Sequence, residues 1–424
     1  MKKYDLIVAG GGFAGVGAAL AAAREGLSVL LFDKSGSLGG AAGNCLVNPF
    51  MPYWTNVAEN GVKKRKNLST GIFSEITDTI EKMGGACFEE HQTFHEEYLK
   101  LALERMLIKE NVELLYHSYL IETSCENGRV NSIKVANKSG TIELKADYFI
   151  DATGDADLAY QADFPCRLGR KKDNLCQPMT LCFRVANVDI EKFQKDRHNA
   201  NEKYKKLKAE GKIRNIREDI LIFPTMINGT LHFNSTRIVK LNPVNAFDIT
   251  KAEIEAREQV FELFDFMVKN CDGFQNAQIS SVAYEIGVRE SRMIEGDFVL
   301  TQEDLIACKK FDDAIAACNY DIDIHNPEGS GTSHYYFKDG TYYTIPYRCL
   351  MPKNTKNVLV AGRCLSSTHE AQASYRIMPV CCCTGQAAGS AVSVAFKQKA
   401  DVGDIDAGEI QKILSKNNAF YGEI

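Results

Sequence analysis

Three glycines near the N-terminus have the spacing of a loop that binds phosphate. The loop is the G-x-G-x-x-G stretch Gly10, Gly11, Gly12, Phe13, Ala14 and Gly15. Glycine at the fixed positions permits a tight turn, brings the backbone close to a pyrophosphate and lets a helix pack closely on a strand. Asp33 follows 18 residues after Gly15, near the distance at which an acidic side chain accepts hydrogen bonds from both ribose hydroxyls. This spacing predicts binding of a dinucleotide without a 2′-phosphate.

The segments around this loop supply the strands and the helix that such a site needs. Residues 4–9 are a short apolar run, as in a parallel strand buried on both faces. Residues 16–24 are mostly small and predict a helix, and residues 27–32 form a second apolar run that leads into Asp33. Residues 6–23 include five glycines, so strand, turn and helix explain them better than a secretion signal does.

Further glycine turns follow other apolar runs. The stretch after the first acidic residue contains Lys34, Gly39, Gly40, Ala41 and Gly43. An apolar run at 148–152 ends in Ala152, Thr153, Gly154 and Asp155. Residues 357–361 lead into Gly362 and Arg363, and a small-residue helix over 384–391 contains Gly385, Gln386 and Ala387.

In this order, these stretches resemble the FAD-dependent oxidoreductase family of two-dinucleotide-binding-domain flavoproteins. That family is distantly related to the flavoprotein subunits of succinate dehydrogenase and fumarate reductase. The resemblance covers residues 1–160 and 345–395 most clearly. It implies FAD as cofactor, and the lack of an obvious attachment motif indicates that FAD is held noncovalently. A tether through Cys45 or His369 stays open as the alternative.

The resemblance also implies which residues contact FAD. In the family, the glycine pair crosses the phosphates and the ribityl chain, the A-T-G turn passes beside the phosphates, and the strand around Leu120 contacts adenine. Pro379 suits the first turn of the helix that contains residues 384–391, and an N-terminus there would stabilise negative charge on the reduced flavin, unless this helix only packs on the sheet. The implied FAD-binding residues are Gly10, Gly12, Phe13, Ala14, Gly15, Asp33, Lys34, Gly39, Gly40, Ala41, Gly43, Leu120, Ala152, Thr153, Gly154, Asp155, Gly362, Arg363, Gly385, Gln386 and Ala387.

We therefore predict an α/β fold with a Rossmann-like FAD-binding domain assembled from both chain ends. A mixed α+β substrate or cap domain is inserted between them. The expected boundaries are 1–160 and 346–424 for the FAD-binding domain and 161–345 for the inserted domain.

Local signals predict several elements in more detail. Asn-Gly and Ser-Gly turns near 127–128 and 139–140 predict hairpins. The charged stretch 192–212 predicts a solvated helix. A capping box at Thr250 predicts a helix that reaches about Lys269, and a hairpin is expected around Asp339 and Gly340.

The candidate catalytic side chains are Arg289, Arg292, His369 and Arg376. An arginine near a flavin can bind a carboxylate or donate a proton, and a histidine can donate a proton near neutral pH. Arg289 and Arg292 would share one face of a helix but would face opposite ways on a strand. For each of these residues a structural salt bridge or hydrogen bond is the alternative role.

The expected reaction class is hydride transfer between flavin N5 and a small organic substrate, as in C=C reduction or CH–CH dehydrogenation. Residues 156–345 contain no second G-x-G-x-x-G, and Phe50 stands where a C-x-x-x-x-C pair with Cys45 would need a thiol. A built-in NAD(P)H domain and a redox dithiol are therefore not expected. The alternatives are an oxidase or hydroxylase that uses O₂, and a flavin subunit that passes electrons to a separate redox partner.

Composition excludes several other classes. The net charge of −5 and the pI near 6.0 give no general attraction for nucleic acid. The 14 cysteines include no C-x-x-C pair, so neither a zinc ribbon nor another metal site is expected. Unpaired thiols indicate a reducing, cytoplasmic location, and the run Cys381 to Cys383 is assigned to helix packing. No stretch approaches the ~20 apolar residues of a membrane span. The oligomeric state is left open.

Overall fold

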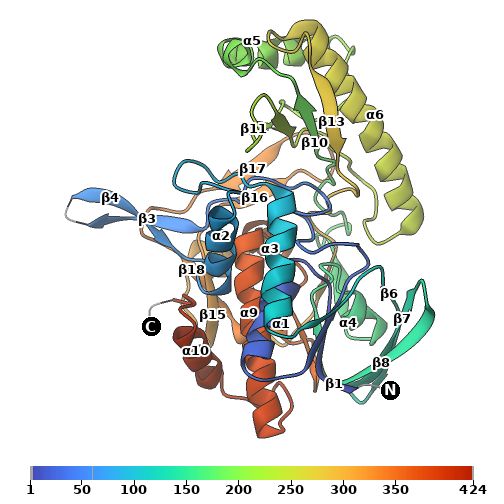
Figure 1. The fold of residues 1–424 in the computed structure, drawn as a ribbon, viewed down its shortest axis with the longest axis vertical. Coiled ribbons are helices and arrows are strands. Elements are labelled where there is room, and N and C mark those ends of the chain that lie inside the picture. Colours follow the sequence, from blue (N-terminus) through green and yellow to red (C-terminus); the bar gives the residue numbers. More distant parts are fainter. Residues whose placement is uncertain (1–2, 60, 423–424) are drawn as a thin grey trace.

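The apolar runs at the chain start and near residue 150 form neighbouring strands of a seven-stranded sheet (Figure 1). The structure is a computed structural model that describes residues 3–59 and 61–422. The strand order is β5-β2-β1-β8-β7-β6, and β19 pairs with β8. β5, β2, β1 and β19 run parallel to their neighbours, whereas β6, β7 and β8 are joined antiparallel. These strands are β1 (Lys3–Ala9), β2 (Val29–Phe32), β5 (Glu113–Leu115), β6 (Tyr119–Glu126), β7 (Arg129–Asn137), β8 (Gly140–Asp151) and β19 (Val358–Val360).

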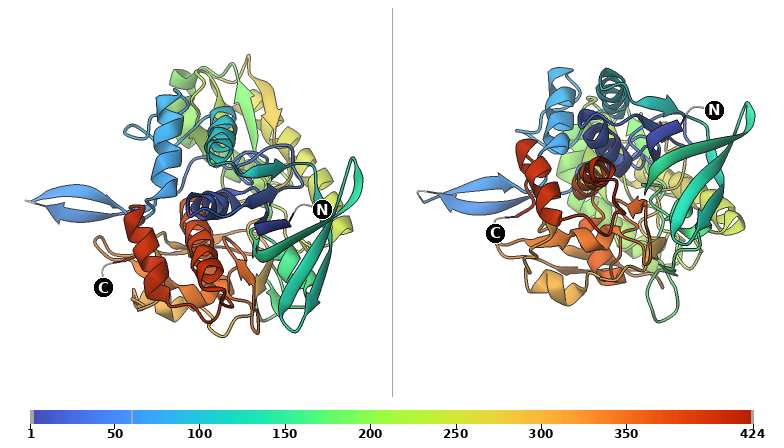
Figure 2. Two further views of the ribbon diagram at one scale, coloured as in Figure 1. Left: turned by 60° about the horizontal axis from the view of Figure 1, so that its bottom comes forward. Right: turned by 90° about the horizontal axis from the view of Figure 1, so that it is seen from below.

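Both chain ends build this domain, as the sequence predicted. β19, from the C-terminal part, pairs with Phe149–Asp151 of β8, and β1 pairs with the same part of β8 on its other side. Helix α1 (Phe13–Arg24) packs along α9 (Met378–Gln398), and both lie next to the sheet (Figure 2). The other helices of this domain are α2 (Ile72–Lys82), α3 (Glu96–Lys109), α4 (Asp157–Gln161), α7 (Gln302–Ile306), α8 (His369–Tyr375) and α10 (Ala407–Lys416), with the 3₁₀ turn η1 (Tyr347–Leu350).

Glycines allow α1 and α9 to touch through their backbones. A Cβ atom at Gly385 would lie 1.9 Å from the Ala14 carbonyl oxygen, and one at Gly389 would lie 2.1 Å from that of Ala18. Gly17 on α1 makes the reciprocal approach, because its Cβ would lie 2.5 Å from the carbonyl oxygen of Cys382. The flank of the small-residue helix thus packs on α1, and the helix itself begins at Met378 with Pro379 in its first turn.

Helix α9 contradicts the expectation that no stretch of the chain is long and apolar enough to span a membrane. Met378–Gln398 is long and apolar enough to cross a membrane by length and composition, and it is the one helix of the described chain that meets both conditions. In the fold, 94% of its most apolar 18-residue window is buried inside the protein. That burial is typical of a core helix.

A second layer with its own hydrophobic core lies above this domain in Figure 1. We call it the cap. Its core draws on residues from 179 to 286 together with Leu46, whereas residues 294–350 contribute to the core of the sheet domain. The unit with a separate core is therefore shorter than the expected 161–345. The cap contains β10 (Phe183–Ala186), α5 (Ile190–Ala209), β11 (Ile222–Pro224), β12 (Leu231–Phe233), α6 (Ala246–Asn270) and β13 (Gln278–Val282).

Two local predictions for the expected inserted domain, residues 161–345, are wrong. α6 begins at Ala246 with Asn245 as its N-cap, and the Thr250 hydroxyl donates to the Ala246 carbonyl inside the helix, so Thr250 caps nothing. The hairpin around Asp339 does not form, because the two flanking strands pair elsewhere. Those pairs are β16 (Ile322–His325) with β17 (Thr332–Tyr335), and β15 (Ala314–Cys318) with β18 (Tyr343–Pro346). A further two-stranded pair is β9 (Cys166–Leu168) with β14 (Arg292–Ile294).

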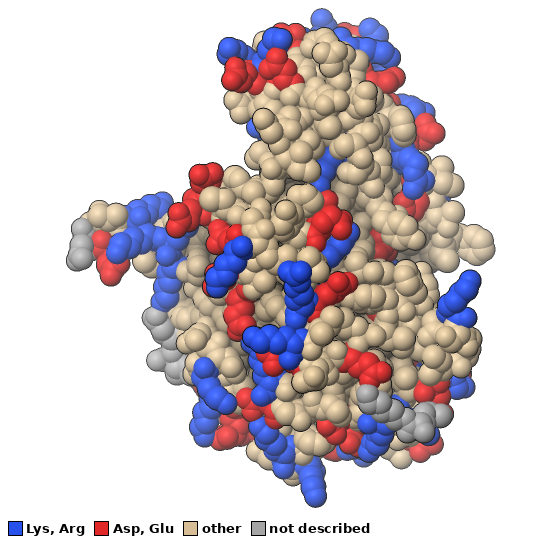
Figure 3. All heavy atoms as spheres, in the orientation of Figure 1, with Lys and Arg blue, Asp and Glu red and all other residues tan. Residues whose placement is uncertain are grey.

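A hairpin projects from the body of the molecule. It consists of β3 (Trp54–Glu59) and β4 (Val62–Asn67), and it extends to the left in Figure 1. β4 carries four basic residues in a row, Lys63, Lys64, Arg65 and Lys66, which appear as the blue group on this arm in Figure 3. Elsewhere on the face drawn there, charges of both signs are interspersed.

Candidate functional site

A cavity opens where the parallel strands end. Its walls come from the turns after β1, β2, β8 and β19, from residues 285–288 of the cap boundary, and from the α8–α9 junction. It encloses about 890 Å³ of space between the protein atoms, part of which is open solvent. The carboxyl ends of parallel strands are where open α/β sheets bind ligands. Among the described residues, no group of three or more His, Cys, Asp or Glu is arranged to hold a metal ion.

The N-terminus of α1 faces this cavity with unused backbone donors. Gly12 is the N-cap residue and no side chain caps the helix, while Gly12, Phe13 and Ala14 line the cavity. The first N–H groups of a helix have no partner within it, and the helix dipole adds positive potential at that end. Amides in this arrangement bind phosphate groups.

Gly10 and Gly15 do not line the cavity but shape the turn between β1 and α1. Gly10 has φ +104°, and a Cβ atom there would lie 2.4 Å from the carbonyl oxygen of Ala152. A Cβ atom at Gly15 would lie 1.8 Å from the carbonyl oxygen of Gly10. Both positions therefore require glycine to bring β1, α1 and the turn after β8 together.

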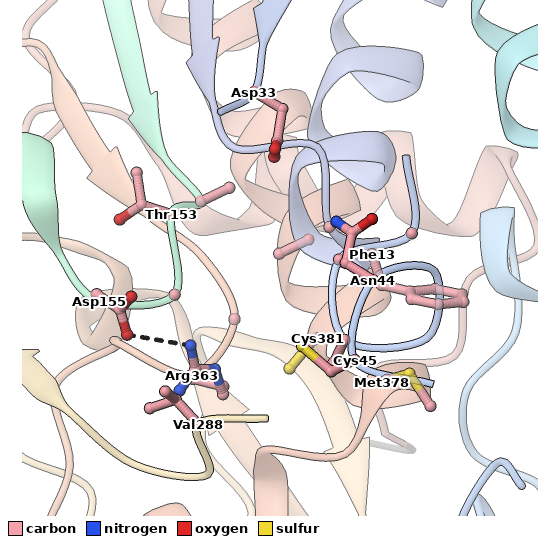
Figure 4. A pocket seen from close by; sticks show the side chains of 18 of the residues that line it. Phe13, Asp33, Asn44, Cys45, Thr153, Asp155, Val288, Arg363, Met378 and Cys381 are labelled. Atoms are coloured by element: carbon pink, nitrogen blue, oxygen red, sulfur yellow. Dashed lines mark hydrogen bonds and ion pairs between the residues drawn. The ribbon is translucent and has the colours of Figure 1, made fainter. Parts of the chain in front are cut away.

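Asp33 lies at one end of the cavity, at the end of β2 (Figure 4). Its carboxylate accepts hydrogen bonds from the backbone N–H groups of Gly11 and of Ser35, at 2.5 and 2.7 Å. The neighbouring Lys34 forms a 3.1 Å ion pair with Glu285 of the cap boundary. Burial would lower the pKa of Lys34, but the charges of Glu285, Asp155 and Asp33 raise it, so Lys34 stays protonated.

An arginine and an aspartate form an ion pair in the wall of the cavity. Arg363, after β19, lies 3.1 Å from Asp155, after β8, as the dashed line in Figure 4 marks. The Arg363 Nη1 atom is buried and has no hydrogen-bond partner among the described residues. Burial would lower the pKa of Arg363, but Asp155 raises it, so the guanidinium keeps its charge. A buried, charged N–H donor without a partner fits an anionic ligand.

These features fit a dinucleotide. The helix amides and the Arg363 guanidinium offer donors for a pyrophosphate, and the carboxylate of Asp33 offers an acceptor for ribose hydroxyls. Gly39, Gly40 and Gly154 have positive φ angles of 99°, 50° and 80°, which lets the bare backbone form the wall there.

The opposite end of the cavity is apolar and lies against the cap. It is lined by Cys45, Ile286, Val288, Met378 and Cys381, and Figure 4 shows most of these side chains away from Asp33. Burial raises the pKa of both thiols, that of Cys381 to about 12 and that of Cys45 further. Both cysteines are therefore neutral thiols.

Of the four expected catalytic side chains, only Arg376 lines the cavity. Its Nη2 atom lies 3.4 Å from an Asp323 carboxylate oxygen, and its Nε atom is buried without a partner among the described residues. Arg289 instead donates to the Pro178 carbonyl and the Thr180 hydroxyl. Burial, then the nearby guanidinium groups including that of Arg376, lower the pKa of Arg289 to about 9.

The other two candidates are held by carboxylates. The His369 Nδ1 atom lies 2.8 Å from both oxygens of Glu290, and this pair is buried. Arg292, on strand β14, forms an ion pair with Asp157 and donates to the Asp155 carbonyl. Arg289 and Arg292 thus point to different partners, as expected for extended backbone.

Some residues expected to bind the cofactor lie elsewhere in the fold. α9 begins at Met378 with Pro379 in its first turn, so Gly385, Gln386 and Ala387 lie within the helix, whereas Met378 and Cys381 at its N-terminus line the cavity. The Gln386 side chain accepts a hydrogen bond from the Ile72 amide. Gly43 and Leu120 do not line the cavity. The backbone beside Asp33 is that of residues 115–118, because Asp33 N–H donates to the Leu115 carbonyl and Ser118 N–H donates to the Asp33 carbonyl.

Sequence reasoning missed several cavity residues. The lining also includes Ser35, Asn44, Glu285, Ile286, Val288, Ala361, Met378 and Cys381, besides Cys45, which the sequence offered only as a tether. Ser35 and Asn44 flank the glycine pair, so their position in the chain could have indicated them. Residues 285–288 carry no comparable signal, because the fold of the cap alone brings them to the cavity.

This chain matches one protein family and is similar to several solved structures. Residues 5–414 match the family described as FAD dependent oxidoreductase. No curated relative matches the sequence. Similar solved structures include a geranylgeranyl bacteriochlorophyll reductase-like protein from Thermoplasma acidophilum, at 13% identity over 99% of this chain and 85% of that chain, with a TM-score of 0.47. The p-nitrophenol 4-monooxygenase of Pseudomonas putida DLL-E4 is 11% identical over 98% of this chain and 84% of that chain, with a TM-score of 0.46.

Proposed function

This chain belongs to the FAD dependent oxidoreductase family, and from that premise we propose that it transfers a hydride between FAD and a small organic substrate. FAD supplies the two-electron couple at flavin N5 when it is bound. One observation carries the proposal: the cavity is lined both by the glycine turns of the sheet domain and by Ile286 and Val288 at the cap boundary. A substrate between cap and sheet domain would share this cavity with the cofactor.

The polar end of the cavity is assigned to the nucleotide part of FAD. The α1 amides and Arg363 would bind the pyrophosphate, because they are the donors left free there. Asp33 would accept hydrogen bonds from the ribose hydroxyls. The glycine turns at 39–40 and 154 would leave room for the chain of phosphates and ribityl carbons.

Noncovalent binding of FAD is part of the proposal. Cys45 lines the cavity, but burial raises its pKa and keeps it a neutral thiol, whereas the thiolate is the reactive nucleophile. His369 is held by Glu290 and does not line the cavity. These observations favour noncovalent FAD over the tether through either residue.

Arg376 is assigned to the substrate. It lines the cavity, as does Met378 two residues later in the chain, and its Nε–H group has no hydrogen-bond partner among the described residues. A guanidinium there would orient a polar group of the substrate by hydrogen bonds. Arg289, Arg292 and His369 make contacts with protein groups, which favours structural roles for them.

The first experiment identifies the cofactor. The purified protein is examined by absorbance, then acid-precipitated, and the released chromophore is separated by chromatography. We expect FAD in the supernatant. A yellow pellet over a colourless supernatant would refute noncovalent binding. Protein that stays colourless after FAD is added would refute the whole proposal.

The second experiment tests the reaction. The FAD-loaded protein is mixed anaerobically with panels of small oxidisable compounds, and bleaching of the flavin is followed; in the reverse direction, the photoreduced protein is mixed with activated alkenes. We expect one panel to change the redox state of the flavin. Arg376→Met should slow this reaction at least about tenfold, whereas Arg348→Met, which removes a guanidinium paired with Asp313 at the surface, should not.

The same assay separates the alternative reactions. Rapid reoxidation by air with peroxide release would indicate an oxidase or hydroxylase. Reoxidation only by an added iron–sulfur protein or flavodoxin would indicate a subunit that serves a redox partner. Either result would replace direct hydride exchange with a small substrate as the proposed function.

A further inference from the structure

Arg289, at the boundary between the cap and the sheet domain, forms no ion pair with any carboxylate among the described residues. Its Nη1 atom donates to the Pro178 carbonyl at 2.6 Å and to the Thr180 hydroxyl at 2.5 Å. Its Nη2 atom donates to the side-chain oxygen of Asn234 at 3.3 Å. These acceptors are neutral, so they hold the side chain in place without compensating its charge.

The charges around Arg289 are already matched with one another. Three other guanidinium groups lie close enough to influence it, and each of them has a carboxylate of its own. These ion pairs are Arg376–Asp323, Arg217–Asp219 and Arg237–Glu218, at 3.4, 3.1 and 3.5 Å. Glu290, the next residue in the chain, pairs with His369 instead. Within the described chain, Arg289 is therefore the member of this group that lacks a counter-charge.

The position of Arg289 makes that unpaired charge unfavourable. Burial, and then the neighbouring guanidinium groups, lower the pKa of Arg289 to about 9, so the side chain is still protonated at neutral pH. The residue is only half-buried, and it thus keeps some accessible surface although it lies deep in the protein. Charged groups in such places are normally paired. A bound anion would supply the missing counter-charge.

Arg376 brings a second guanidinium group to the same region. It follows the last residue of α8, and Gln372, one turn earlier, donates to the Arg289 carbonyl at 2.8 Å. Arg376 and Val288, the residue before Arg289, both line the cavity, and Figure 4 shows Val288 at the end opposite Asp33. Arg289 and Arg376 each have an Nε–H group without a hydrogen-bond partner among the described residues.

We propose that the substrate carries a carboxylate, which binds between Arg289 and Arg376 at the cap boundary. This assignment rests on the proposed function, because it gives the substrate of that reaction its charged group. Two Nε–H donors on separate guanidinium groups match the two oxygens of one carboxylate. A monoanion also balances the single unpaired charge of Arg289, whereas a phosphate dianion would bring one negative charge too many into the interior.

Binding of small acids to the FAD-loaded full chain tests the assignment. Acetate, crotonate and benzoate are each compared with the amide of the same shape, and binding is followed by flavin absorbance and by thermal unfolding. We expect at least one acid to bind at least about tenfold more tightly than its amide, because a neutral amide supplies no counter-charge. Inorganic phosphate should bind more weakly than that acid. Equal binding of every acid and its amide, or tighter binding of phosphate, would overturn the proposal.

Variants of Arg289 separate its charge from its hydrogen bonds. Arg289→Gln should reduce the preference for acid over amide at least about tenfold, whereas Arg289→Lys keeps a charge and should retain a preference. Arg348→Gln is the control, since it removes a guanidinium group paired with Asp313 at the surface, and it should bind the acid as the unmodified protein does. Equal preferences in the Gln and Lys variants of Arg289 would overturn the proposal.

Two further readouts keep these outcomes distinct. FAD content and thermal unfolding show whether each variant has folded, and the comparison of acid with amide on the unmodified protein needs no variant. If a neutral compound changes the redox state of the flavin and no acid is preferred over its amide, the hydride transfer stands and the carboxylate site is refuted. If an acid is preferred but no compound changes the redox state of the flavin, the carboxylate site is supported and the proposed reaction is refuted.

Discussion

Arg363 and Asp155 lie 208 residues apart in the chain, yet their side chains approach to 3.1 Å in the wall of the cavity. One follows β19 and the other follows β8, two strands that pair in parallel. The contact therefore joins the N-terminal and C-terminal parts of the FAD-binding domain at the point where the cofactor is expected. It keeps the guanidinium charged and in place, with one donor left over.

The spare donor of Arg363 leads to a first prediction. Arg363→Met should raise the dissociation constant for FAD about tenfold to a hundredfold, because a charge-assisted hydrogen bond to phosphate is worth about 1.5–3 kcal/mol. The measurement is titration of the FAD-depleted protein with FAD, followed by flavin fluorescence. Arg348→Met should bind FAD as the unmodified protein does. Equal affinity in both variants would mean that Arg363 serves only the ion pair with Asp155.

Asp33 gives a second prediction for the other end of the cavity. Asp33→Ala removes the acceptor for the ribose hydroxyls and also the hydrogen bonds from the Gly11 and Ser35 amides. We expect less FAD to be retained through purification, measured as the ratio of flavin to protein absorbance. Asp5→Ala is a suitable control, since Asp5 accepts hydrogen bonds from Ser28 at the exposed start of the same sheet. Unchanged FAD content in Asp33→Ala would contradict the proposal that Asp33 accepts hydrogen bonds from the ribose hydroxyls.

Close packing of α1 and α9 gives a third prediction. Alanine normally favours a helix over glycine by about 1 kcal/mol, but at Gly389 the new Cβ would lie 2.1 Å from the Ala18 carbonyl oxygen. Gly389→Ala should therefore lower the free energy of unfolding by about 1–3 kcal/mol. Gly403→Ala, where nothing lies within 4 Å of the new atom, should be close to neutral. Urea unfolding of the two variants compares them directly, and equal stabilities would mean that α9 can shift without cost.

A buried ion pair between the two layers gives a fourth prediction. Arg184 on β10 of the cap donates to both carboxylate oxygens of Glu96 at the start of α3, at 2.6 and 2.5 Å, and the two side chains are only 6% and 10% exposed. Burial alone would raise the pKa of Glu96, but the hydrogen bonds from Arg184 hold it below its usual value.

Breaking this pair should be costly. Glu96→Gln leaves a buried guanidinium without its counter-charge, and we expect a loss of about 3–5 kcal/mol in unfolding free energy. Glu97→Gln changes the next residue, which is 64% exposed, and should cost little. Denaturant unfolding of both variants at neutral pH is the measurement. A loss below about 1 kcal/mol in Glu96→Gln would show that the two layers do not depend on this contact.

His232 on β12 gives a fifth prediction, on pH dependence. Both ring nitrogens are buried without a partner among the described residues. Burial, and then the charge of Arg184, lower the pKa of His232 from 6.5 to about 3. The unfolded chain therefore takes up a proton at a higher pH than the folded protein does. The free energy of unfolding is therefore not lowered by this proton uptake above pH 6.5, and it falls progressively as the pH drops toward 3.

His232→Phe should remove that loss. The variant should unfold at a higher temperature than the unmodified protein, because it also removes two unsatisfied polar atoms. The difference in the free energy of unfolding between the two proteins should widen by up to about 4 kcal/mol as the pH falls from 6.5 toward 3. Thermal unfolding at a series of pH values measures it. His198→Phe, at an exposed position of α5, should show no widening, and a constant difference in His232→Phe would contradict the assignment.

The sequence alone determined the class of fold and most of the glycine turns at the cavity. Gly10, Gly12 and Gly15 could be interpreted because their spacing directly after a short apolar run is that of a phosphate-binding turn, and Gly10 and Gly15 indeed have no room for a Cβ atom. The same holds for Asp33 at the end of a short apolar strand and for the turn at Gly154. Local signals of this kind depend on residues close together in the chain.

Tertiary structure decided what the local signals could not. The small-residue helix α9 combines two roles that its residues alone could not separate: its flank packs on α1 through Gly385 and Ala14, while Met378 and Cys381 at its N-terminus line the cavity. Four polar residues near the C-terminal motif looked alike as catalytic candidates, yet only Arg376 lines the cavity, because buried partners such as Glu290 hold the others. Which side chains meet depends on how the cap closes over the sheet domain, and contacts between residues so far apart in the chain leave no mark in the spacing of its residues.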